Sequence, residues 1–202
     1  MVVSRSGSDS VNRSMNDIVG YLDAALEKKQ PQGSLGDFMA DALYYGAKEK
    51  FGVDPDVAVV NYGGIRLTQI PVGALTRGKV FELMPFDNLV VLQRVKGDVL
   101  QQFLEHTAAN GGWPLSGASL QVVNKKAAQI LVKGKPIDPA KTYILVNSDY
   151  VANGGDNAAM LKSIPQENKG YLMRDAIFDY IKALKASGKK ISVTEEKRVY
   201  AQ

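Results

Sequence analysis

The stretch "DVAVVNYGGIR", residues 56–66, carries the pattern on which the predicted fold rests. The run Val57 to Val60 is apolar throughout and leaves no polar face, which is typical of a strand buried on both sides. Asn61 follows this run, and Gly63 and Gly64 then allow a positive φ or a close approach of the backbone to a neighbour. The sequence therefore predicts a doubly buried strand that ends in an irregular loop.

Helices and strands are both expected around this strand. Apolar residues recur at helical spacing in several segments. The predicted helices cover residues 11–29, 34–51, 76–84, 97–106, 157–161 and 171–186. Ser34 and Asp37 match a capping box at the start of the second of these helices. Predicted strands cover residues 89–96, 120–123, 129–133, 142–147 and 191–193, with a hairpin turn at residues 124–126.

The order of these elements predicts the fold class. Helices and strands mix without strict βα alternation, which favours an α+β fold, with mixed β-sheets flanked by helices, over a doubly wound sheet. The chain has no internal repeat, low-complexity tract or long linker. We therefore expect a single domain over residues 11–202, after a flexible lead-in at residues 1–10.

Composition excludes several classes of protein and of site. The 202 residues are 45% hydrophobic and 23% charged, as in ordinary soluble globular proteins. No apolar run reaches the roughly 18 residues of a transmembrane helix. The net charge is +4 without a dense arginine stripe, so no nucleic-acid partner is expected. The absence of cysteine excludes disulfides, thiolate metal sites and a cysteine nucleophile. The lysines in and after the last long helix are expected to be solvated: Lys182, Lys185, Lys189 and Lys190.

The chain has a single histidine, His106. Zinc sites and two-metal hydrolase sites need several histidine and carboxylate ligands that converge on one point. His106 ends an amphipathic pattern, so we expect it in the last turn of a helix or on the surface. The sequence also lacks the motifs H-E-x-x-H, G-x-S-x-G and G-x-x-x-x-G-K-[ST]. No catalytic residue and no metal ligand are therefore assigned.

Two loops carry polar or aromatic residues at the ends of predicted elements. In the loop at residues 61–66, Arg66 offers a planar, charged fork for an oxygen-rich ligand. A tight turn and a solvated arginine explain the same residues. In "LMPFDN", residues 83–88, the proline ends a helix and leaves Phe86 in an irregular position. A phenylalanine in the core is the alternative interpretation.

A third loop, "SDYVANGGDNAAM" at residues 148–160, combines an aromatic residue, glycines and a carboxylate. Tyr150 follows the carboxyl end of a predicted strand, where ligands often bind in sheet proteins. Asn153, Gly154 and Gly155 cannot continue regular structure, and the glycines permit close approach. The Asp156 carboxylate could accept hydrogen bonds from ligand hydroxyls. Alternatively, Asp156 caps the helix that follows.

Taken together, the three loops supply the groups of a nucleoside or nucleotide site. Two aromatic faces can hold a flat ring, and base–aromatic stacking contributes on the order of 1–3 kcal/mol per base. A carboxylate suits the hydroxyls of a ribose. An arginine suits ribose oxygens or a phosphate.

Five motifs in this order resemble one known family. They are "SLGDFMADAL" (34–43), "VNYGGIR" (60–66), "GKVFELMPFDNLVVLQRVKG" (78–97), "SGASLQV" (116–122) and "GKPIDPAKTYILVNSDYVANGGD" (134–156). The chain resembles the C-terminal, substrate-binding domain of the 5'-nucleotidases and related UDP-sugar hydrolases. The resemblance extends from residue 34 to residue 156 and onward through the last long helix.

The resemblance implies a role for each matching residue. The base would stack between Phe86 and Tyr150, the latter at a place where the family usually has phenylalanine. Asn61 and Arg66 would contact the base and the ribose or phosphate, and Asp156 would hold the ribose hydroxyls. Lys29 is the nearest candidate for a basic residue that often precedes the S-L-G segment in the family. The substrate-binding residues implied or inferred are Asn61, Gly63, Gly64, Arg66, Phe86, Tyr150, Asn153 and Asp156.

One part of the family pattern has no counterpart in this sequence. Family enzymes carry a preceding metallophosphatase domain with two metals, and the chain resembles the recognition half alone. The resemblance thus implies a nucleotide-recognition domain or subunit whose partner domain holds the divalent metals and hydrolyses the phosphate ester. It also implies an exported protein, periplasmic or at the cell surface. A stand-alone nucleoside- or nucleotide-binding module is the alternative, and an autonomous hydrolase using His106 is the third hypothesis. Whether the chain is itself an enzyme is left open.

Overall fold

A mixed five-stranded sheet forms the centre of the fold in a computed structural model that describes residues 14–201. Its strands lie in the order β12 (Gln166–Leu172), β6 (Leu89–Lys96), β11 (Thr142–Ser148), β3 (Val57–Val59) and β7 (Leu115–Ser116). β11 and β3 are parallel, and the other neighbours are antiparallel. With helices on both faces, this sheet confirms the predicted α+β class.

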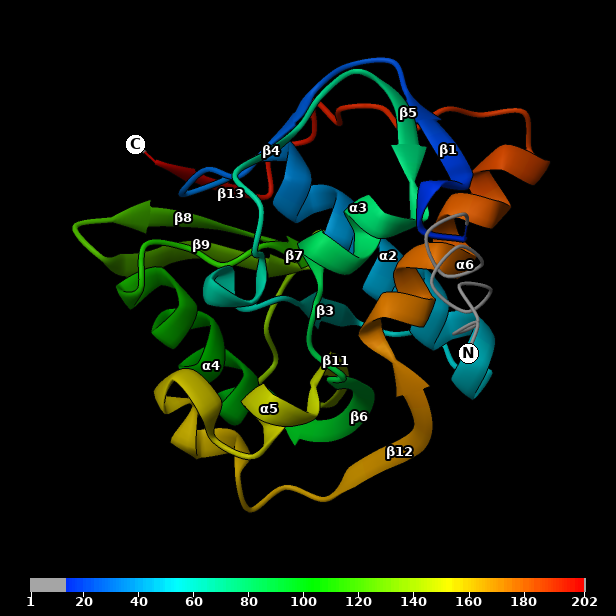
Figure 1. Cartoon of the computed structure of the whole chain (residues 1–202). Helices are drawn as coiled ribbons and strands as arrows, with labels where there is room; N and C mark the ends of the chain where they lie inside the picture. The colour runs from blue at the N-terminus through cyan, green and yellow to red at the C-terminus, as the bar shows by residue number, and fades with distance from the viewer. Residues whose placement is uncertain (1–13, 202) are drawn as a thin grey trace, which may run out of the picture.

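Two hydrophobic clusters lie on opposite faces of the central sheet. One cluster contains residues of α2 (Ser34–Phe51), α3 (Arg77–Leu83) and α6 (Met173–Ala186). The other contains residues of α4 (Gly97–Ala109). Val57 and Val59 point into the second cluster and Ala58 into the first, so the prediction that β3 is buried on both faces is confirmed. Figure 1 shows α6 on one side of the molecule and α4 on the other.

A second sheet lies next to α4 and contains the predicted hairpin. Its strands are β10 (Lys135–Pro136), β9 (Lys126–Val132), β8 (Ala118–Val123) and β13 (Val199–Ala201). The hairpin turn is Asn124–Lys125, both with positive φ as a type I′ turn requires, so it is one residue shorter than expected. The strand expected at residues 191–193 is wrong: Ile191 makes only an isolated bridge with Leu22, and the last strand is β13.

The helix expected at residues 11–29 is wrong over residues 17–29; of its described part, only residues 14–16 are helical. Residues 17–29 instead contain β1 (Ile18–Leu22) and β2 (Leu26–Glu27), which pair with β5 (Gly73–Thr76) and β4 (Gln69–Ile70). β1 contains two β-branched residues and a glycine, which are weak helix formers. A Cβ on Gly20 would lie 2.7 Å from Ile181 Cγ2, so the glycine lets β1 pack closely on α6. Long-range packing thus overrides the helical spacing.

Several local details differ from the predictions. The bounds of α2 are as expected, but its N-cap is Gly33, and no capping box forms. Ser34 Oγ instead accepts a hydrogen bond from the Glu27 amide at 2.8 Å, which ties α2 to β2. The helix expected at residues 157–161 is replaced by two 3₁₀ turns, η2 (Gly155–Asn157) and η3 (Ala159–Leu161). The helices α3, α4 and α6 and the strands β6 and β11 confirm the predictions to within a few residues.

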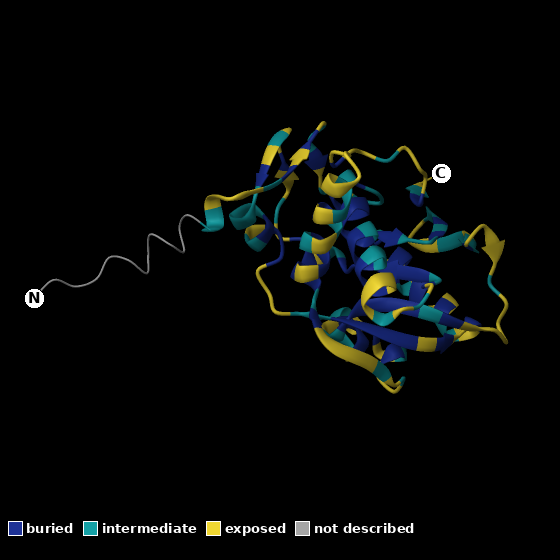
Figure 2. Cartoon of the chain, turned by 90° about the vertical axis from the view of Figure 1, so that its right-hand side faces the viewer, coloured by how far each residue is buried: buried dark blue, intermediate teal, exposed yellow. Residues whose placement is uncertain are grey.

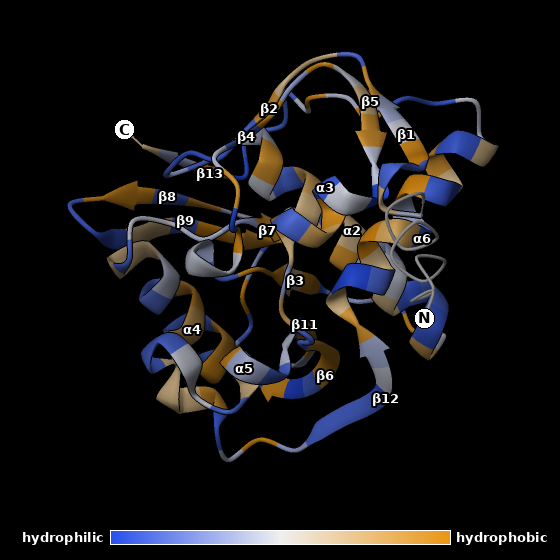
Figure 3. Ribbon diagram, in the orientation of Figure 1, coloured by the Kyte–Doolittle hydropathy of each residue, from blue (hydrophilic) through white to orange (hydrophobic). Residues whose placement is uncertain are grey.

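The surface is polar where the central sheet is exposed. Buried residues are concentrated in the central strands and the helix faces that cover them (Figure 2). The edge strand β12 is hydrophilic, whereas β3 is hydrophobic (Figure 3). All the lysines expected to be solvated are exposed.

Among residues 14–201, no helix combines the length and apolarity needed to cross a membrane. The predicted lead-in at residues 1–10 lies outside the described residues, and the single domain stays a prediction.

Candidate functional site

Three loops meet at one edge of the central sheet because of the directions in which its strands run. β3 and β11 are parallel neighbours, so their carboxyl ends lie at the same edge. β6 is antiparallel to β11 and pairs Val90 with Ser148, so β6 begins where β11 ends. The segments that follow β3, precede β6 and follow β11 are therefore neighbours. They carry residues 61–66, 85–88 and 149–156.

The first loop places a buried amide at this edge. Asn61 is 6% exposed and precedes a short 3₁₀ turn, η1 (Tyr62–Gly64). A Cβ on Gly64 would lie 2.8 Å from Asn61 Oδ1, so glycine permits the close packing of that amide. Neither Gly63 nor Gly64 has the positive φ that their sequence allows. Gly64 therefore serves close approach and not a left-handed turn, whereas a Cβ on Gly63 would meet nothing within 4 Å.

The second loop presents Phe86 to solvent. Its side chain is 43% exposed, so the alternative of a core phenylalanine is wrong. Arg174 of α6 donates to the carbonyl oxygens of Met84 and Phe86, at 3.0 and 3.2 Å. The guanidinium carbon of Arg66 lies 5.4 Å from the centroid of the Phe86 ring. Arg174 thus holds the backbone of this loop, while the Phe86 ring remains exposed beside Arg66.

The third loop begins with α5 (Asp149–Ala152) and ties Tyr150 to Asp156. The Tyr150 side chain is 46% exposed, and its hydroxyl donates to Asp156 Oδ1 at 2.8 Å. Asn61 Nδ2 donates to the other oxygen, Asp156 Oδ2, at 2.8 Å. Asp156 makes no side-chain cap, so the helix-cap alternative is wrong. Its carboxylate instead joins the first loop to the third.

One carboxylate oxygen also joins the second loop to the third. Asp149 Oδ1 accepts hydrogen bonds from the backbone amides of Leu89 and Tyr150, at 3.0 and 2.9 Å. Leu89 directly follows the segment that carries Phe86. The positions of the two aromatic residues are therefore linked through Asp149.

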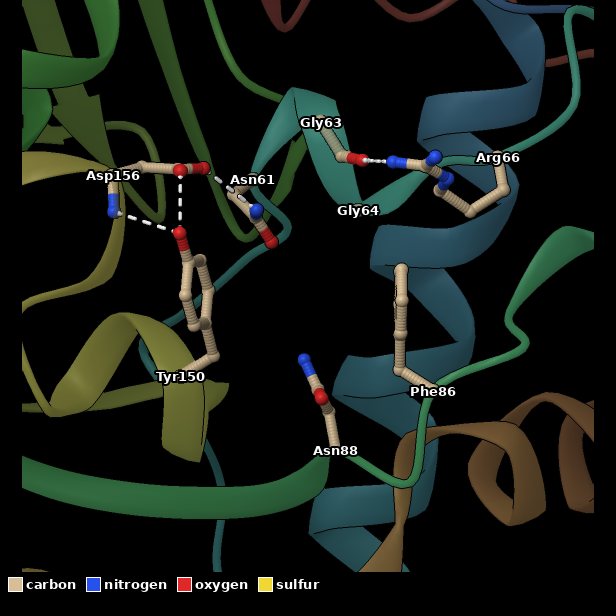
Figure 4. A pocket seen from close by; sticks show the side chains of 8 residues that line it. All are labelled: Asn61, Gly63, Gly64, Arg66, Phe86, Asn88, Tyr150 and Asp156. Atoms are coloured by element: carbon tan, nitrogen blue, oxygen red, sulfur yellow. Dashed lines mark hydrogen bonds between the residues drawn. The ribbon is translucent and has the colours of Figure 1, made fainter.

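The three loops enclose a cavity of about 430 Å³. Figure 4 shows the rings of Phe86 and Tyr150 on opposite sides of it, with Asp156 and Asn61 together at one end and Arg66 beside Phe86. The lining residues are Asn61, Gly63, Gly64, Arg66, Phe86, Asn88, Tyr150 and Asp156. The structure thus brings together residues that the sequence singled out in three separate motifs.

Asn153 and Asn88 differ from the sequence-based expectation. Asn153, predicted to bind substrate, is exposed and does not line the cavity; its Oδ1 accepts a hydrogen bond from Gln166 Nε2 at 2.9 Å. Asn153 is the C-cap of α5, and this hydrogen bond ties its side chain to β12 and not to the cavity. Asn88 lines the cavity and was not predicted. The one signal for it is a polar residue directly before a predicted strand at the same edge.

One basic residue, Lys28, supports the first loop from outside the cavity lining. Lys28 Nζ donates to the Ile65 carbonyl oxygen at 2.9 Å and lies 4.2 Å from the centroid of the Tyr62 ring. Burial and then the charge of Arg66 lower the pKa of Lys28. The basic residue near this site is therefore Lys28, whereas Lys29 is exposed. The positive charges of Arg66 and the nearby Lys28 together favour an anionic ligand group.

His106 confirms its predicted place in the last turn of α4 but has a contact that the sequence did not reveal. Its Nε2 donates to the Asp156 carbonyl oxygen at 2.8 Å. Asp156 has a φ of 51°, in the left-handed region that aspartate tolerates better than most residues. The imidazole thus helps to hold Asp156 in this conformation.

The cavity lining combines two aromatic rings, a carboxylate and an arginine. The hydrogen bond to Asp156 raises the pKa of the Tyr150 hydroxyl, so Tyr150 acts as a neutral donor. Within residues 14–201, no three histidine, cysteine, aspartate or glutamate side chains gather as metal ligands would.

Comparisons with known proteins support the resemblance seen in the sequence. A family model described as "5'-nucleotidase, C-terminal domain" matches residues 13–163. Trifunctional nucleotide phosphoesterase protein YfkN of Bacillus subtilis (strain 168) is 29% identical over 210 residues, which cover 91% of this chain and 14% of YfkN. Protein UshA of Escherichia coli (strain K12) is 32% identical over 148 residues, which cover 70% of this chain and 26% of UshA.

A solved structure has the same fold. The crystal structure of a 5'-nucleotidase precursor from Thermus thermophilus aligns with a TM-score of 0.83 at 25% identity, covering 96% of this chain and 41% of that one. The chain therefore corresponds to a part of each of these proteins, and spans about a quarter or less of the two curated relatives.

Proposed function

The chain belongs to the family of 5'-nucleotidase C-terminal domains, and we propose that it recognises a nucleotide for a metallophosphatase domain. In this proposal, the cavity holds the base and the ribose. The other domain, on the same or a separate polypeptide, hydrolyses the phosphate ester. This chain supplies affinity and orientation, which place the phosphate where the chemistry occurs.

The single observation that carries the proposal is the pair of aromatic faces across one cavity. Phe86 and Tyr150 are 43% and 46% exposed although each lies in a loop held by hydrogen bonds. Large exposed aromatic side chains in ordered segments are favourable sites for a flat apolar ligand. A base between them covers both faces and gains on the order of 1–3 kcal/mol from stacking.

The remaining lining groups suit the rest of a nucleotide. Asp156 has acceptor sites left after its bonds with Tyr150 and Asn61, because a carboxylate offers about four. These sites can accept hydrogen bonds from the ribose hydroxyls. Arg66 lines the cavity and Lys28 lies near it, so that burial together with the charge of Arg66 lowers the pKa of Lys28. A phosphate beside them would relieve the repulsion between the two charges and complete the recognition.

Metal chemistry is assigned to the other domain. The described residues provide no group of three metal-binding side chains, so they do not fit the two divalent metals that the resemblance implies. No step through a metal is therefore derived for this chain. We also propose that the protein acts outside the cytoplasm, in the periplasm or at the cell surface, on the resemblance alone.

Calorimetry with four ribonucleoside monophosphates, AMP, GMP, CMP and UMP, tests the proposal. At least one should bind the isolated chain, and Phe86→Ala should weaken that binding about tenfold or more, as expected for the loss of one stacking face. Val72→Ala is the matched control, because Val72 is a 63% exposed apolar residue that does not line the cavity. Binding of none of the four at millimolar concentration would refute the proposal. Equal weakening by both variants would refute the role of Phe86.

A further inference from the structure

Tyr150 carries a hydroxyl that a stacking face does not require, since Phe86 offers such a face without one. We propose that Tyr150 is a specificity-determining residue whose hydroxyl fixes the Asp156 carboxylate relative to the stacking ring, so that the site selects nucleotides with a ribose diol. The inference rests on the proposed function and deepens it. It attributes discrimination between ribose and sugars that lack the diol to the contact between Tyr150 and Asp156.

The ring and the carboxylate form one unit in the structure. The Tyr150 hydroxyl donates to Asp156 Oδ1 at 2.8 Å and accepts from the Asp156 amide at 3.3 Å. A Cβ on Gly155 would lie 2.6 Å from Tyr150 Cε1, so the glycine lets the ring lie against the backbone. Figure 4 shows the hydroxyl directed at Asp156 while the ring borders the cavity. A phenylalanine at this position would lose both hydrogen bonds and leave the ring free to turn.

Asp156 is held at three further points. Asn61 Nδ2 donates to Oδ2, and His106 Nε2 donates to the carbonyl oxygen, both at 2.8 Å. The backbone is fixed in the left-handed region, with a φ of 51°. Each carboxylate oxygen thus has one protein donor and retains acceptor capacity for another. Two free acceptor positions on one fixed carboxylate match the two adjacent hydroxyls of a ribose.

A fixed carboxylate discriminates more strongly than a mobile one. When a ligand without the diol covers the cavity, the fixed Asp156 carboxylate cannot reorient towards solvent. Its free acceptor positions then lose the hydrogen bonds that water supplied. A site built to bind a hydroxyl rejects an analogue that lacks it for this reason. The hydrogen bond with Asp156 also raises the pKa of the Tyr150 hydroxyl, which keeps its proton and stays a donor.

The test measures two affinities in each of three proteins. Calorimetry compares whichever of AMP, GMP, CMP and UMP binds most tightly with its 2',3'-dideoxy counterpart. The proteins are the wild type, Tyr150→Phe and Tyr21→Phe. Tyr21→Phe is the matched control, because Tyr21 is 48% exposed on β1 and does not line the cavity. Tyr150→Phe is expected to fold, since the ring it alters is half exposed, and circular dichroism checks this.

Tyr150→Phe should weaken ribonucleotide binding about tenfold, and dideoxynucleotide binding by less than about twofold, as the loss of a hydrogen bond to a charged group predicts. Tyr21→Phe should change neither. An equal change in both affinities would overturn the inference while leaving the proposed function intact. So would tighter ribonucleotide binding by Tyr150→Phe, which would mean that the hydroxyl competes with the ribose. Binding of no ribonucleotide by the wild type would instead refute the proposed function and this inference with it.

Discussion

Replacement of Arg174 by methionine should loosen the loop that carries Phe86. Arg174 is buried, with a side chain 10% exposed, and its Nη1 donates to the carbonyl oxygens of Met84 and Phe86. Its Nη2 donates to Asp87 Oδ1 at 2.8 Å. The guanidinium carbon lies 4.3 Å from the centroid of the Phe81 ring. Methionine fills most of the same space but offers no donor.

The expected loss in the free energy of unfolding follows from how far each accepting oxygen is buried. Met84 is 1% exposed, so its carbonyl oxygen would lose its donor in a buried place, at a cost of about 1–3 kcal/mol. The pair with Asp87 adds little, because the Asp87 side chain is 81% exposed. Relief from burying a charge offsets part of the loss. We expect the free energy of unfolding to fall by about 2 kcal/mol, or the melting temperature by about 4–8 °C.

Urea and thermal unfolding measure this effect against Arg94→Met. Arg94 pairs with Glu167 at 3.1 Å, and both side chains are about half exposed, at 52% and 51%. The control should therefore lose no more than about 0.5 kcal/mol. Arg174→Met should also weaken nucleotide binding, because Phe86 is no longer held in place. Equal unfolding midpoints for the two variants would refute the reasoning, since the loop carbonyls would then have found other donors.

Two further predictions concern stability. Gly155→Ala places a Cβ 2.5 Å from the Tyr150 carbonyl oxygen and should lower the free energy of unfolding by about 1–3 kcal/mol. Gly63→Ala, with nothing within 4 Å, should change it by less than about 0.5 kcal/mol, and equal losses in thermal unfolding would contradict this. Burial raises the pKa of the Asp37 carboxyl above its ordinary 3.8, so the folded state binds more protons and the contribution of Asp37 to stability falls as pH rises through that range. Asp37→Asn should therefore gain stability relative to the wild type as pH rises above the ordinary carboxyl value of 3.8, and a difference independent of pH would be the contrary result.

Local sequence patterns correctly predicted those helices and strands whose conformation follows from their own residues. The apolar spacing within α2, α3 and α4, and the alternation or apolar runs of β6, β11 and β3, are properties of short segments. Residues 18–27 show the limit of this reasoning. Their spacing fits a helix, but β1 pairs with β5, more than 50 positions later, and packs on α6 through Gly20. Such pairing depends on residues that no local window contains.

For the site, the amino-acid sequence by itself determined which residue types stand at the ends of β3 and β11 and at the start of β6. The family resemblance and most of the cavity lining follow from these motifs. Only the tertiary structure decided that Phe86 is exposed, that Asn88 lines the cavity and that Asn153 does not. It alone joined Asp156 to Asn61, 95 positions earlier, and to His106, 50 positions earlier. The physical reason is that hydrogen bonds and burial depend on distance in space, which the folding of the sheet sets and the spacing of residues along the chain does not.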